Sequence, residues 1–425
     1  MNQRPNPMSV DGLSEDARHK ERLLMLFALA MPLAFSVWMA MLNNFAENVV
    51  GFDGKDIGAV QAIREIPGFL AFLAVYLIIF IREQRLALLS LMLLGFGVAL
   101  TGYLPTFWGV ALTTIVSSIG FHYYETVNQS LQLQWLSKER APVVMGRLAG
   151  IGSSTAFLAF GAIFLAAHPS AQAALGISAP PYEVLYLLGG AATMALAAYA
   201  WFSYPMFPES NAQAKRIVLK RRYWLYYALV FFAGARRQIF VVFAGFMMVQ
   251  KFGYGLSDFA LLLIVNHAVN TVFAPFMGRM LSRHGERAVL TFEYLGLICV
   301  FSAYMIVEDP LIAAALYIID HLFFGLHFAQ KTYFQKIADA EDMAPTAAVA
   351  FTINHIAAVA LPLPLGVLYL VSPSAVFGVG VGFAVCSLAL ARLVPRLPQA
   401  EGETLWRPAA MATRQAAMWF VGRRP

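Results

Sequence analysis

The apolar stretch around residue 320 carries an acid, an imidazole and an ammonium group at helical spacing. Asp320, Phe324, His327 and Lys331 lie four, three and four residues apart, which places them on one face of a helix. An ionisable side chain at the centre of a membrane helix costs about 2.5–3.5 kcal/mol on insertion scales, so it usually faces a cavity or a partner. Histidine exchanges protons near neutral pH. We therefore expect Asp320 to exchange protons, and His327 and Lys331 to contact a substrate.

Two consecutive arginines, Arg236 and Arg237, lie in the middle of another apolar stretch. Consecutive residues of a helix point about 100° apart, so only one of the two need face a cavity, and the sequence leaves open which one. Buried cations bind anionic groups through charge-assisted hydrogen bonds. The cationic excess here therefore predicts a substrate with an anionic group.

Polar residues in other apolar stretches extend the candidate site. We expect three amides to contribute to substrate binding and four ionisable residues to contribute to proton coupling: Asn266, Asn270 and Asn354 for the first role, and Glu125, His122, Glu65 and Arg64 for the second. Two structural alternatives stay open. Glu65 can simply neutralise Arg64, and Asp320 can form a buried pair with His321, in which case these residues would only hold helices together.

Such residues must be positioned by membrane-spanning elements. Of the 425 residues, 60% are hydrophobic and 13% charged, whereas a soluble domain carries about 25% charged residues. A segment in lipid must pair its own backbone groups, so each long apolar run predicts a helix. We predict an all-α membrane protein with twelve spans of about 20 residues, at 23–47, 57–81, 86–104, 106–134, 145–167, 182–204, 223–250, 257–280, 288–307, 311–335, 345–371 and 374–394.

The two halves of the chain repeat one pattern at a constant offset. Gly51-Phe52 corresponds to Gly253-Tyr254, and Asp56 corresponds to Asp258. A repeat this long indicates a duplicated domain, so the twelve helices should form two pseudo-symmetric six-helix bundles. The predicted divisions are a tail at 1–22, bundles at 23–204 and 223–395, a linker at 205–222, and a tail with an amphipathic helix at 396–425.

The basic residues predict the orientation. Lysine and arginine gather in alternate loops and in both tails, while the other loops hold only Lys55 and Lys251. Cytoplasmic loops carry the excess of positive charge. Both termini should therefore be cytoplasmic, and we expect the bacterial inner membrane as the location.

The segment Gly278-Arg-Met-Leu-Ser-Arg-His-Gly-Glu-Arg287 resembles the Gly-x-x-x-Asp-Arg-x-Gly-Arg-Arg signature of the major facilitator superfamily. The resemblance implies a transporter in which two bundles rock about a central cavity. It also implies a conformational latch, with candidate residues Gly278, Arg283, Gly285, Arg287 and Asp258. The family's aspartate is Ser282 here, and the signatures of drug antiporters are missing: Val116 stands where they carry arginine.

The charged stripe and the resemblance together predict a secondary active transporter. The cargo would be a small anionic or zwitterionic solute, coupled to protons; the alternative is an exporter of amphipathic compounds or lipids without a fixed anion site. No nucleotide loop or hydrolase motif is present, so we expect no enzyme activity. The histidines and acids show no paired ligand spacing, so we expect neither metal nor cofactor. The expected partners are the solute, the lipid bilayer and protons, with no nucleic acid, and the protein should be a monomer.

Overall fold

The structure is a computed structural model that describes residues 14–136, 140–176, 178, 180–207, 219–339, 342–399 and 402–406. Within these residues the regular elements are all helical, and no strand is present. Ten helical segments are long and apolar enough to cross a membrane. The prediction of an all-α membrane protein is therefore confirmed.

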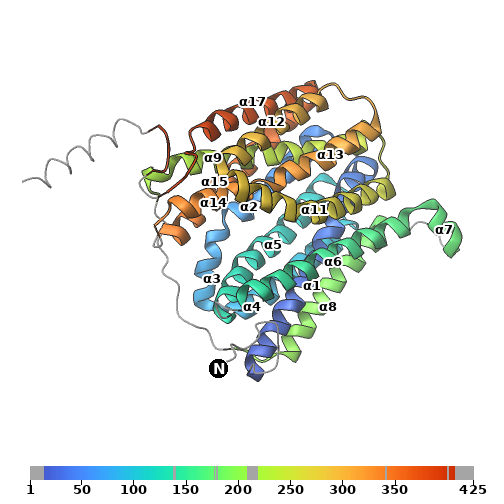
Figure 1. Ribbon diagram of the computed structural model, residues 1–425. Helices are drawn as coiled ribbons and strands as arrows, with labels where there is room; N and C mark the ends of the chain where they lie inside the picture. The colour runs from blue at the N-terminus through green and yellow to red at the C-terminus, as the bar shows by residue number, and fades with distance from the viewer. Residues whose placement is uncertain are drawn as a thin grey trace, which may run out of the picture.

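The first half of the chain forms one bundle, shown from blue to green in Figure 1. Its elements are α1 (Glu15–Phe45), η1 (Ala46–Val50), α2 (Gly54–Phe69), η2 (Ala71–Leu73), α3 (Ala74–Phe80), α4 (Glu83–Thr101), α5 (Phe107–Trp135), α6 (Ala141–Ala167), α7 (Pro169–Leu175) and α8 (Tyr182–Ser203).

The second half forms the other bundle, shown from yellow-green to red. It comprises η3 (Arg221–Tyr223), α9 (Trp224–Gln238), η4 (Ile239–Ala244), α10 (Gly245–Gln250), α11 (Leu256–His284), α12 (Glu286–Tyr304), α13 (Pro310–Gly325), α14 (Phe328–Ile337), α15 (Met343–Ala360), α16 (Pro362–Val371) and α17 (Pro373–Arg392).

Two of the twelve predicted spans have no counterpart among these ten apolar segments. They correspond to α5 and to the broken segment from α2 to α3. α5 is long but rich in polar side chains, and α2 contains Pro67 shortly before the helix breaks. Proline removes a helical hydrogen bond and favours such a break. Both exceptions therefore have a local cause, and the structure is consistent with twelve crossings.

The sequence repeat corresponds to a repeated local structure. Gly51 and Gly253 adopt left-handed conformations with φ of 80° and 67°, which glycine allows without steric cost. The following helices are capped alike, because Asp56 accepts a hydrogen bond from the Asp53 amide at 3.4 Å and Asp258 from the Gly255 amide at 3.1 Å. The repeated aspartates are thus helix caps.

The two bundles touch at the end of the molecule where α2 begins. α2 packs against α15 and α16, and α6 packs against α11. A Cβ atom at Gly58 would lie 2.3 Å from the carbonyl oxygen of Pro362, and one at Gly366 would lie 2.4 Å from that of Gly54. Glycine is therefore required for the backbones of α2 and α16 to approach this closely.

At the opposite end, each bundle packs chiefly on itself. α3 contacts α4 and α5, and α14 contacts α9 and α12, so neither helix has its main contacts with the other bundle. Figure 1 shows α3 and α14 on the left-hand side of the molecule. Tyr76 and Phe80 of α3 are 59% and 85% exposed. The bundles thus contact each other at the end where α2 begins, and each packs chiefly on itself at the end that carries α3 and α14.

An ion-pair cluster fastens the start of the second bundle. The Lys220 ammonium lies 2.5 Å from the Asp342 carboxylate, and the Tyr223 hydroxyl donates a hydrogen bond to the same carboxylate at 2.7 Å. Burial raises the pKa of Asp342, but the hydrogen bonds from Lys220 and Tyr223 outweigh it and hold this pKa below its usual value. Arg222 forms a further ion pair with Glu403 at 2.7 Å. The described end of the C-terminal segment therefore packs against this bundle, while the predicted amphipathic helix lies outside the described residues.

Candidate functional site

Two small pockets lie among the buried ionisable residues, one in each bundle. The N-terminal pocket is lined by Phe35, Trp38, Arg64, Leu94, Val98, Ser117, Ser118 and Phe121. The C-terminal pocket is lined by Ala233, Arg236, Arg237, Phe240, Glu293, Leu297, Phe301, Asp320, Phe324 and His327. The structure therefore gathers four of the predicted site residues, Arg236, Arg237, Asp320 and His327, around one pocket.

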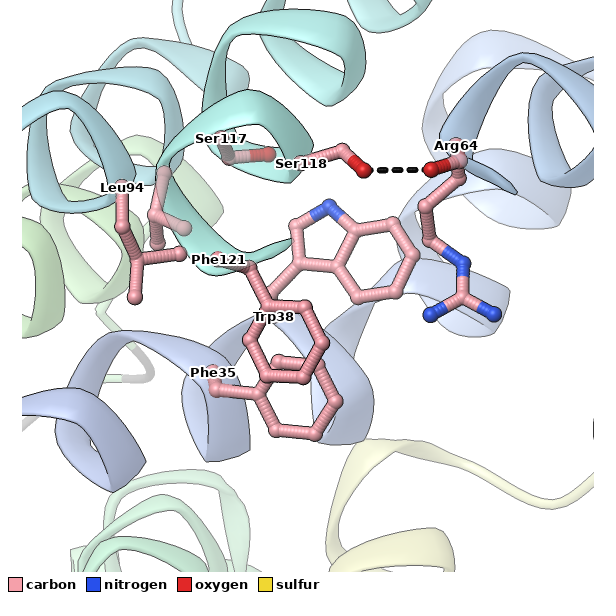
Figure 2. Close-up of a pocket in the computed structure, with 8 residues that line it drawn as sticks. Phe35, Trp38, Arg64, Leu94, Ser117, Ser118 and Phe121 are labelled. Atoms are coloured by element: carbon pink, nitrogen blue, oxygen red, sulfur yellow. Dashed lines mark hydrogen bonds between the residues drawn. The ribbon is translucent and has the colours of Figure 1, made fainter. Parts of the chain in front are cut away.

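The N-terminal pocket is an aromatic box with an arginine at its edge (Figure 2). The rings of Phe35 and Phe121 are stacked, with centroids 4.7 Å apart and planes 13° apart. The guanidinium of Arg64 lies 5.6 Å from the ring of Trp38, within the range of a cation–π interaction. The Ser118 hydroxyl donates a hydrogen bond to the backbone carbonyl of Arg64 and so links α5 to α2. Such a pocket suits a flat or apolar group with a polar end.

Arg64 and Glu65 form a buried ion pair. The two residues are only 6% and 1% exposed, and the Nε of Arg64 donates a hydrogen bond to Gln61 at 2.7 Å. The structural alternative stated for this pair is therefore supported. The pair engages Oε1 of Glu65, however, and Oε2 has no hydrogen-bond partner among the described residues.

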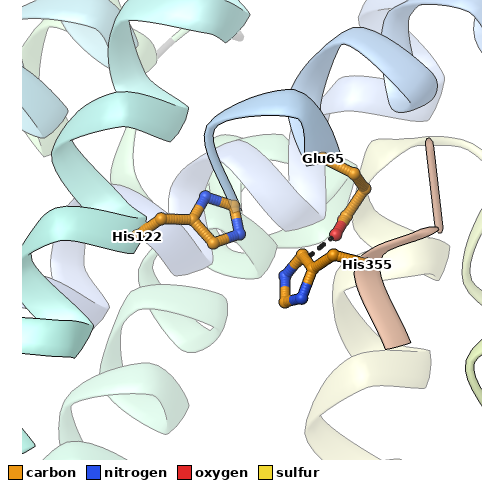
Figure 3. Close-up of side chains that lie close together, drawn as sticks. All are labelled: Glu65, His122 and His355. Carbon is orange, nitrogen blue, oxygen red and sulfur yellow. Dashed lines mark ion pairs between the residues drawn. The ribbon is translucent and has the colours of Figure 1, made fainter. Parts of the chain in front are cut away.

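Glu65 also lies beside two histidines from other helices (Figure 3). Its Oε2 is 3.6 Å from the Nε2 of His355 on α15, and the rings of His355 and His122 have centroids 5.4 Å apart. One potential ligand atom from each of these three buried residues lies within 4.8 Å of the others. We expected no metal site because the histidines and acids show no paired ligand spacing in the sequence. The fold nevertheless brings three possible ligands together from α2, α5 and α15.

The local contacts orient both imidazole rings. The Nδ1 of His122 lies 3.0 Å from the carbonyl oxygen of Ser118, and the Nδ1 of His355 lies 2.9 Å from that of Phe351. A carbonyl oxygen can only accept, so each Nδ1 carries a hydrogen, and in the neutral imidazole each Nε2 keeps a lone pair. A Cβ atom at Gly68 would lie 2.4 Å from the Nε2 of His355 and 2.6 Å from that of His122. Glycine at this position therefore makes room for both rings.

The C-terminal pocket distinguishes the two consecutive arginines. Arg236 is 4% exposed, and its guanidinium lies 3.5 Å from Glu293 and 4.4 Å from the ring of Tyr294. Glu293 was missed in the sequence, although an acid within the apolar run at 288–307 was a detectable signal. Arg237 has no hydrogen bond or ion pair with any described residue, and its charge acts on Arg64 and Glu65 of the other bundle. The geometry therefore favours Arg237 over Arg236 as the residue available to a ligand.

The predicted stripe from Asp320 to Lys331 is interrupted in the structure. α13 ends at Gly325, and the His327 amide bonds to the carbonyl of Phe324, three residues back instead of four. Asp320 and His327 still line the pocket, and Oδ2 of Asp320 has no partner among the described residues. Lys331 is exposed and lies outside the pocket lining. The pocket therefore includes the predicted stripe only as far as His327.

The other predicted binding residues lie in different surroundings. Asn270 donates a hydrogen bond to the side chain of Asn266 at 3.0 Å, within α11. Asn354 packs against Gly234 of α9. Glu125 is partly buried and forms no ion pair with a described residue. None of these four residues lines either pocket.

The predicted latch residues do not form one cluster. Gly285 has a φ of 77° and joins α11 to α12, with Arg283 and Arg287 on either side. Gly278 lies about two turns earlier on α11, where an added Cβ would meet open space. Asp258 caps the far end of α11, a helix of 29 residues, so about 40 Å separates it from this loop. An ion pair of 2.7 Å between Lys336 and Glu286 ties α14 to α12 nearby.

Two related helical bundles that meet around buried ionisable side chains point to a membrane transporter of the alternating-access type. The model of the Major Facilitator Superfamily matches residues 23–362, and the chain belongs to this family. The resemblance seen in the sequence is thereby confirmed.

Solved structures share the fold at low sequence identity. The nucleoside transporter NupG superposes with a TM-score of 0.67 at 14% identity, covering 88% of this chain and 97% of that one. A bacterial homolog of the human lysosomal transporter Spinster, in an inward-facing and occupied conformation, gives 0.70 at 14% identity, covering 93% and 100%. A POT family transporter in complex with 5-aminolevulinic acid gives 0.65 at 12%, covering 90% and 96%. No curated protein matches the chain.

Proposed function

We propose that the protein is a secondary active transporter for a small anionic or zwitterionic solute, coupled to protons. The observation that carries the proposal is the C-terminal pocket, whose lining includes an arginine and a buried acid: among the described residues the arginine has no ion pair, and one oxygen of the acid has no partner. These are Arg237 and Asp320. A solute with a carboxylate or phosphate would satisfy Arg237 through charge-assisted hydrogen bonds, and one that also carries an ammonium group would satisfy Asp320.

Proton coupling rests on Asp320 and His327. Buried acids and histidines in membrane helices that line cavities are the groups that relay protons in transporters. Asp320 lies on α13 and His327 at the break between α13 and α14, where a change in helix geometry would alter the surroundings of both. Proton exchange at this break would thus be linked to movement of α14. Alternating access would then proceed by rocking of one bundle against the other.

The direct test is a ligand screen on the detergent-purified protein. Thermal unfolding is followed in the presence of small carboxylates, phosphate esters and amino acids, at one neutral and one acidic pH, because a ligand that binds the native state raises the apparent stability. A hit should then drive counterflow in proteoliposomes, and an imposed proton gradient should accelerate it. Counterflow that is indifferent to the proton gradient would refute the coupling, and a protein that responds only to uncharged compounds would refute the anion site.

The N-terminal pocket favours a second candidate function, export of amphipathic compounds. Its stacked phenylalanines and Trp38 offer apolar surface, and Arg64 supplies a polar edge. This function predicts binding of neutral aromatic dyes that survives the Arg237→Gln substitution. Loss of dye binding in Phe121→Ala, together with retention in Arg237→Gln, would select this second function over the first.

A further inference from the structure

The cluster formed by Glu65, His122 and His355 has the composition of a transition-metal site. Zinc binds imidazole nitrogens and carboxylate oxygens, often with three protein ligands and one open position. Two histidines and one carboxylate also suit other first-row metals. All three side chains are buried, being 1%, 5% and 5% exposed. This cluster lies outside both pockets and plays no part in the proposed transport mechanism.

The hydrogen bonds around the histidines prepare them as ligands. A metal-binding histidine usually donates its other ring N–H to a carbonyl or carboxylate, which fixes the tautomer and the ring orientation. The Nδ1 atoms of His122 and His355 have such carbonyl partners at 3.0 and 2.9 Å. Their Nε2 atoms both approach Gly68, the residue one helical turn after Glu65. The lone pairs of both rings are thus directed to the region beside the carboxylate.

The distances require only a small contraction. In a tetrahedral site the zinc–ligand distance is about 2.0–2.1 Å, so the ligand atoms are about 3.3 Å from each other. The Glu65 Oε2 to His355 Nε2 distance is 3.6 Å, and the three ligand atoms lie within 4.8 Å of one another. Side-chain rotations that move these atoms by about 1 Å would therefore bring the three ligands to the spacing of a zinc site.

The carboxylate of Glu65 has unused bonding capacity, but cations lie near it. Oε2 has no hydrogen-bond partner among the described residues, and an unsatisfied buried acceptor is costly. Arg64 pairs with Oε1 and leaves Oε2 facing His355, while the charge of Arg237 also acts on this group. These two arginines should weaken the binding of a cation without blocking the free oxygen.

We propose that Glu65, His122 and His355 bind a divalent transition-metal ion of the zinc class. Two ligands come from the N-terminal bundle and His355 comes from the C-terminal bundle. The site is therefore complete only when α15 lies against α2, as it does here. Binding would hold the bundles in this arrangement and oppose their separation.

The test is isothermal titration of the chelator-treated full-length protein with zinc chloride, with magnesium chloride as the comparison. We expect one zinc ion per chain and no comparable magnesium binding. His122→Ala and His355→Ala should each weaken zinc binding at least 10-fold. X-ray absorption of the zinc-loaded protein should show only nitrogen and oxygen neighbours, including imidazole. Wild-type protein that binds zinc no better than magnesium would overturn the proposal.

The matched control is His267→Ala, which removes another membrane-embedded histidine that contacts Phe160 but not the cluster. It should bind zinc like the wild type, and equal loss in this variant would place the metal elsewhere and overturn the assignment. Arg64→Gln supplies a second readout, because removing a nearby cation should strengthen binding. Weaker binding in a variant that remains monodisperse and helical would contradict the role of Glu65. None of these measurements depends on knowing the transported solute.

Discussion

Individual charged side chains divide into those that the fold pairs and those that it leaves available. Arg236 is paired with Glu293, and Arg64 with Glu65, whereas Arg237 has no such partner among the described residues. Loss of one partner of a buried ion pair destabilises the protein, because the other charge is left uncompensated. Arg237 is only partly buried, has no such partner among the described residues and is better explained by a ligand. The two kinds of arginine should therefore respond differently to substitution.

Arg237→Gln should weaken ligand binding and leave stability nearly unchanged. Loss of a hydrogen bond to a charged group costs about 1.5–3 kcal/mol, so the dissociation constant of the solute should rise about 10-fold or more. The measurement is ligand-induced thermal stabilisation of the purified variant, with Arg237→Lys as the charge-conserving control. Unchanged ligand affinity in Arg237→Gln would show that this arginine does not contact the solute.

Arg236→Gln should instead destabilise the C-terminal bundle. The substitution leaves Glu293 buried without its cation, and breaking such a pair costs about 3–5 kcal/mol. Thermal or denaturant unfolding in detergent measures the loss. The double variant Arg236→Gln/Glu293→Gln should recover part of it, because no uncompensated charge remains. Equal stability of Arg236→Gln and the double variant would show that the uncompensated charge of Glu293 is not the source of the loss.

At the scale of elements, the contact between α2 and α16 decides how closely the bundles approach. Gly58→Ala would place a Cβ atom 2.3 Å from the backbone carbonyl of Pro362, and backbone cannot yield as a flexible side chain would. The variant should therefore favour separation of the bundles at this end. Spin labels at Tyr103→Cys and Glu308→Cys, in a background without Cys299 and Cys386, would report a longer distance. Gly150→Ala is the control, since no atom lies within 4 Å of its added Cβ; the same distance in both variants would contradict the prediction.

Lys220, Tyr223 and Asp342 link η3 to the start of α15. The stability that this cluster contributes should depend on pH. The pKa of Asp342 is below its usual value in the folded protein, so its contribution is present above the unfolded pKa of about 3.9 and is lost as pH falls through the lower folded pKa. At neutral pH, Asp342→Asn should cost about 1–3 kcal/mol of stability, because two hydrogen bonds to a charged group are weakened. The difference from wild type should shrink below about pH 4. A difference that stays constant down to lower pH would exclude this ionised carboxylate as its source.

At the scale of the whole molecule, the position of the basic loops predicts which end faces the cytoplasm. The loop between α11 and α12 lies at the end of α11 opposite its Asp258 cap, and the loop between α12 and α13 at the other end of α12. Positive charge marks cytoplasmic loops. In cells whose protein lacks Cys299 and Cys386, Glu308→Cys should react with an impermeant maleimide, and Ser282→Cys only after permeabilisation. The reverse pattern would invert the proposed orientation.

The sequence by itself determined the class of fold, because backbone groups in lipid must pair within a helix and long apolar runs therefore have one solution. It also determined the duplication. The left-handed turns are made by Gly51 and Gly253 and the helix caps by Asp56 and Asp258, and both features depend on nearby residues alone. Asp320 and His327 could be placed together because they share one short stretch of chain.

Only the tertiary structure decided which charges are paired and which residues meet across helices. Glu65, His122 and His355 are far apart in the sequence and lie on three helices from two bundles, so no spacing rule could relate them. The choice between Arg236 and Arg237 likewise depended on Glu293 of another helix. The break between α13 and α14, and the exposed position of Lys331 outside the pocket lining, also could not be read from ideal helical spacing. Periodicity describes one helix, whereas ion pairs and ligand clusters are set by how helices pack against each other.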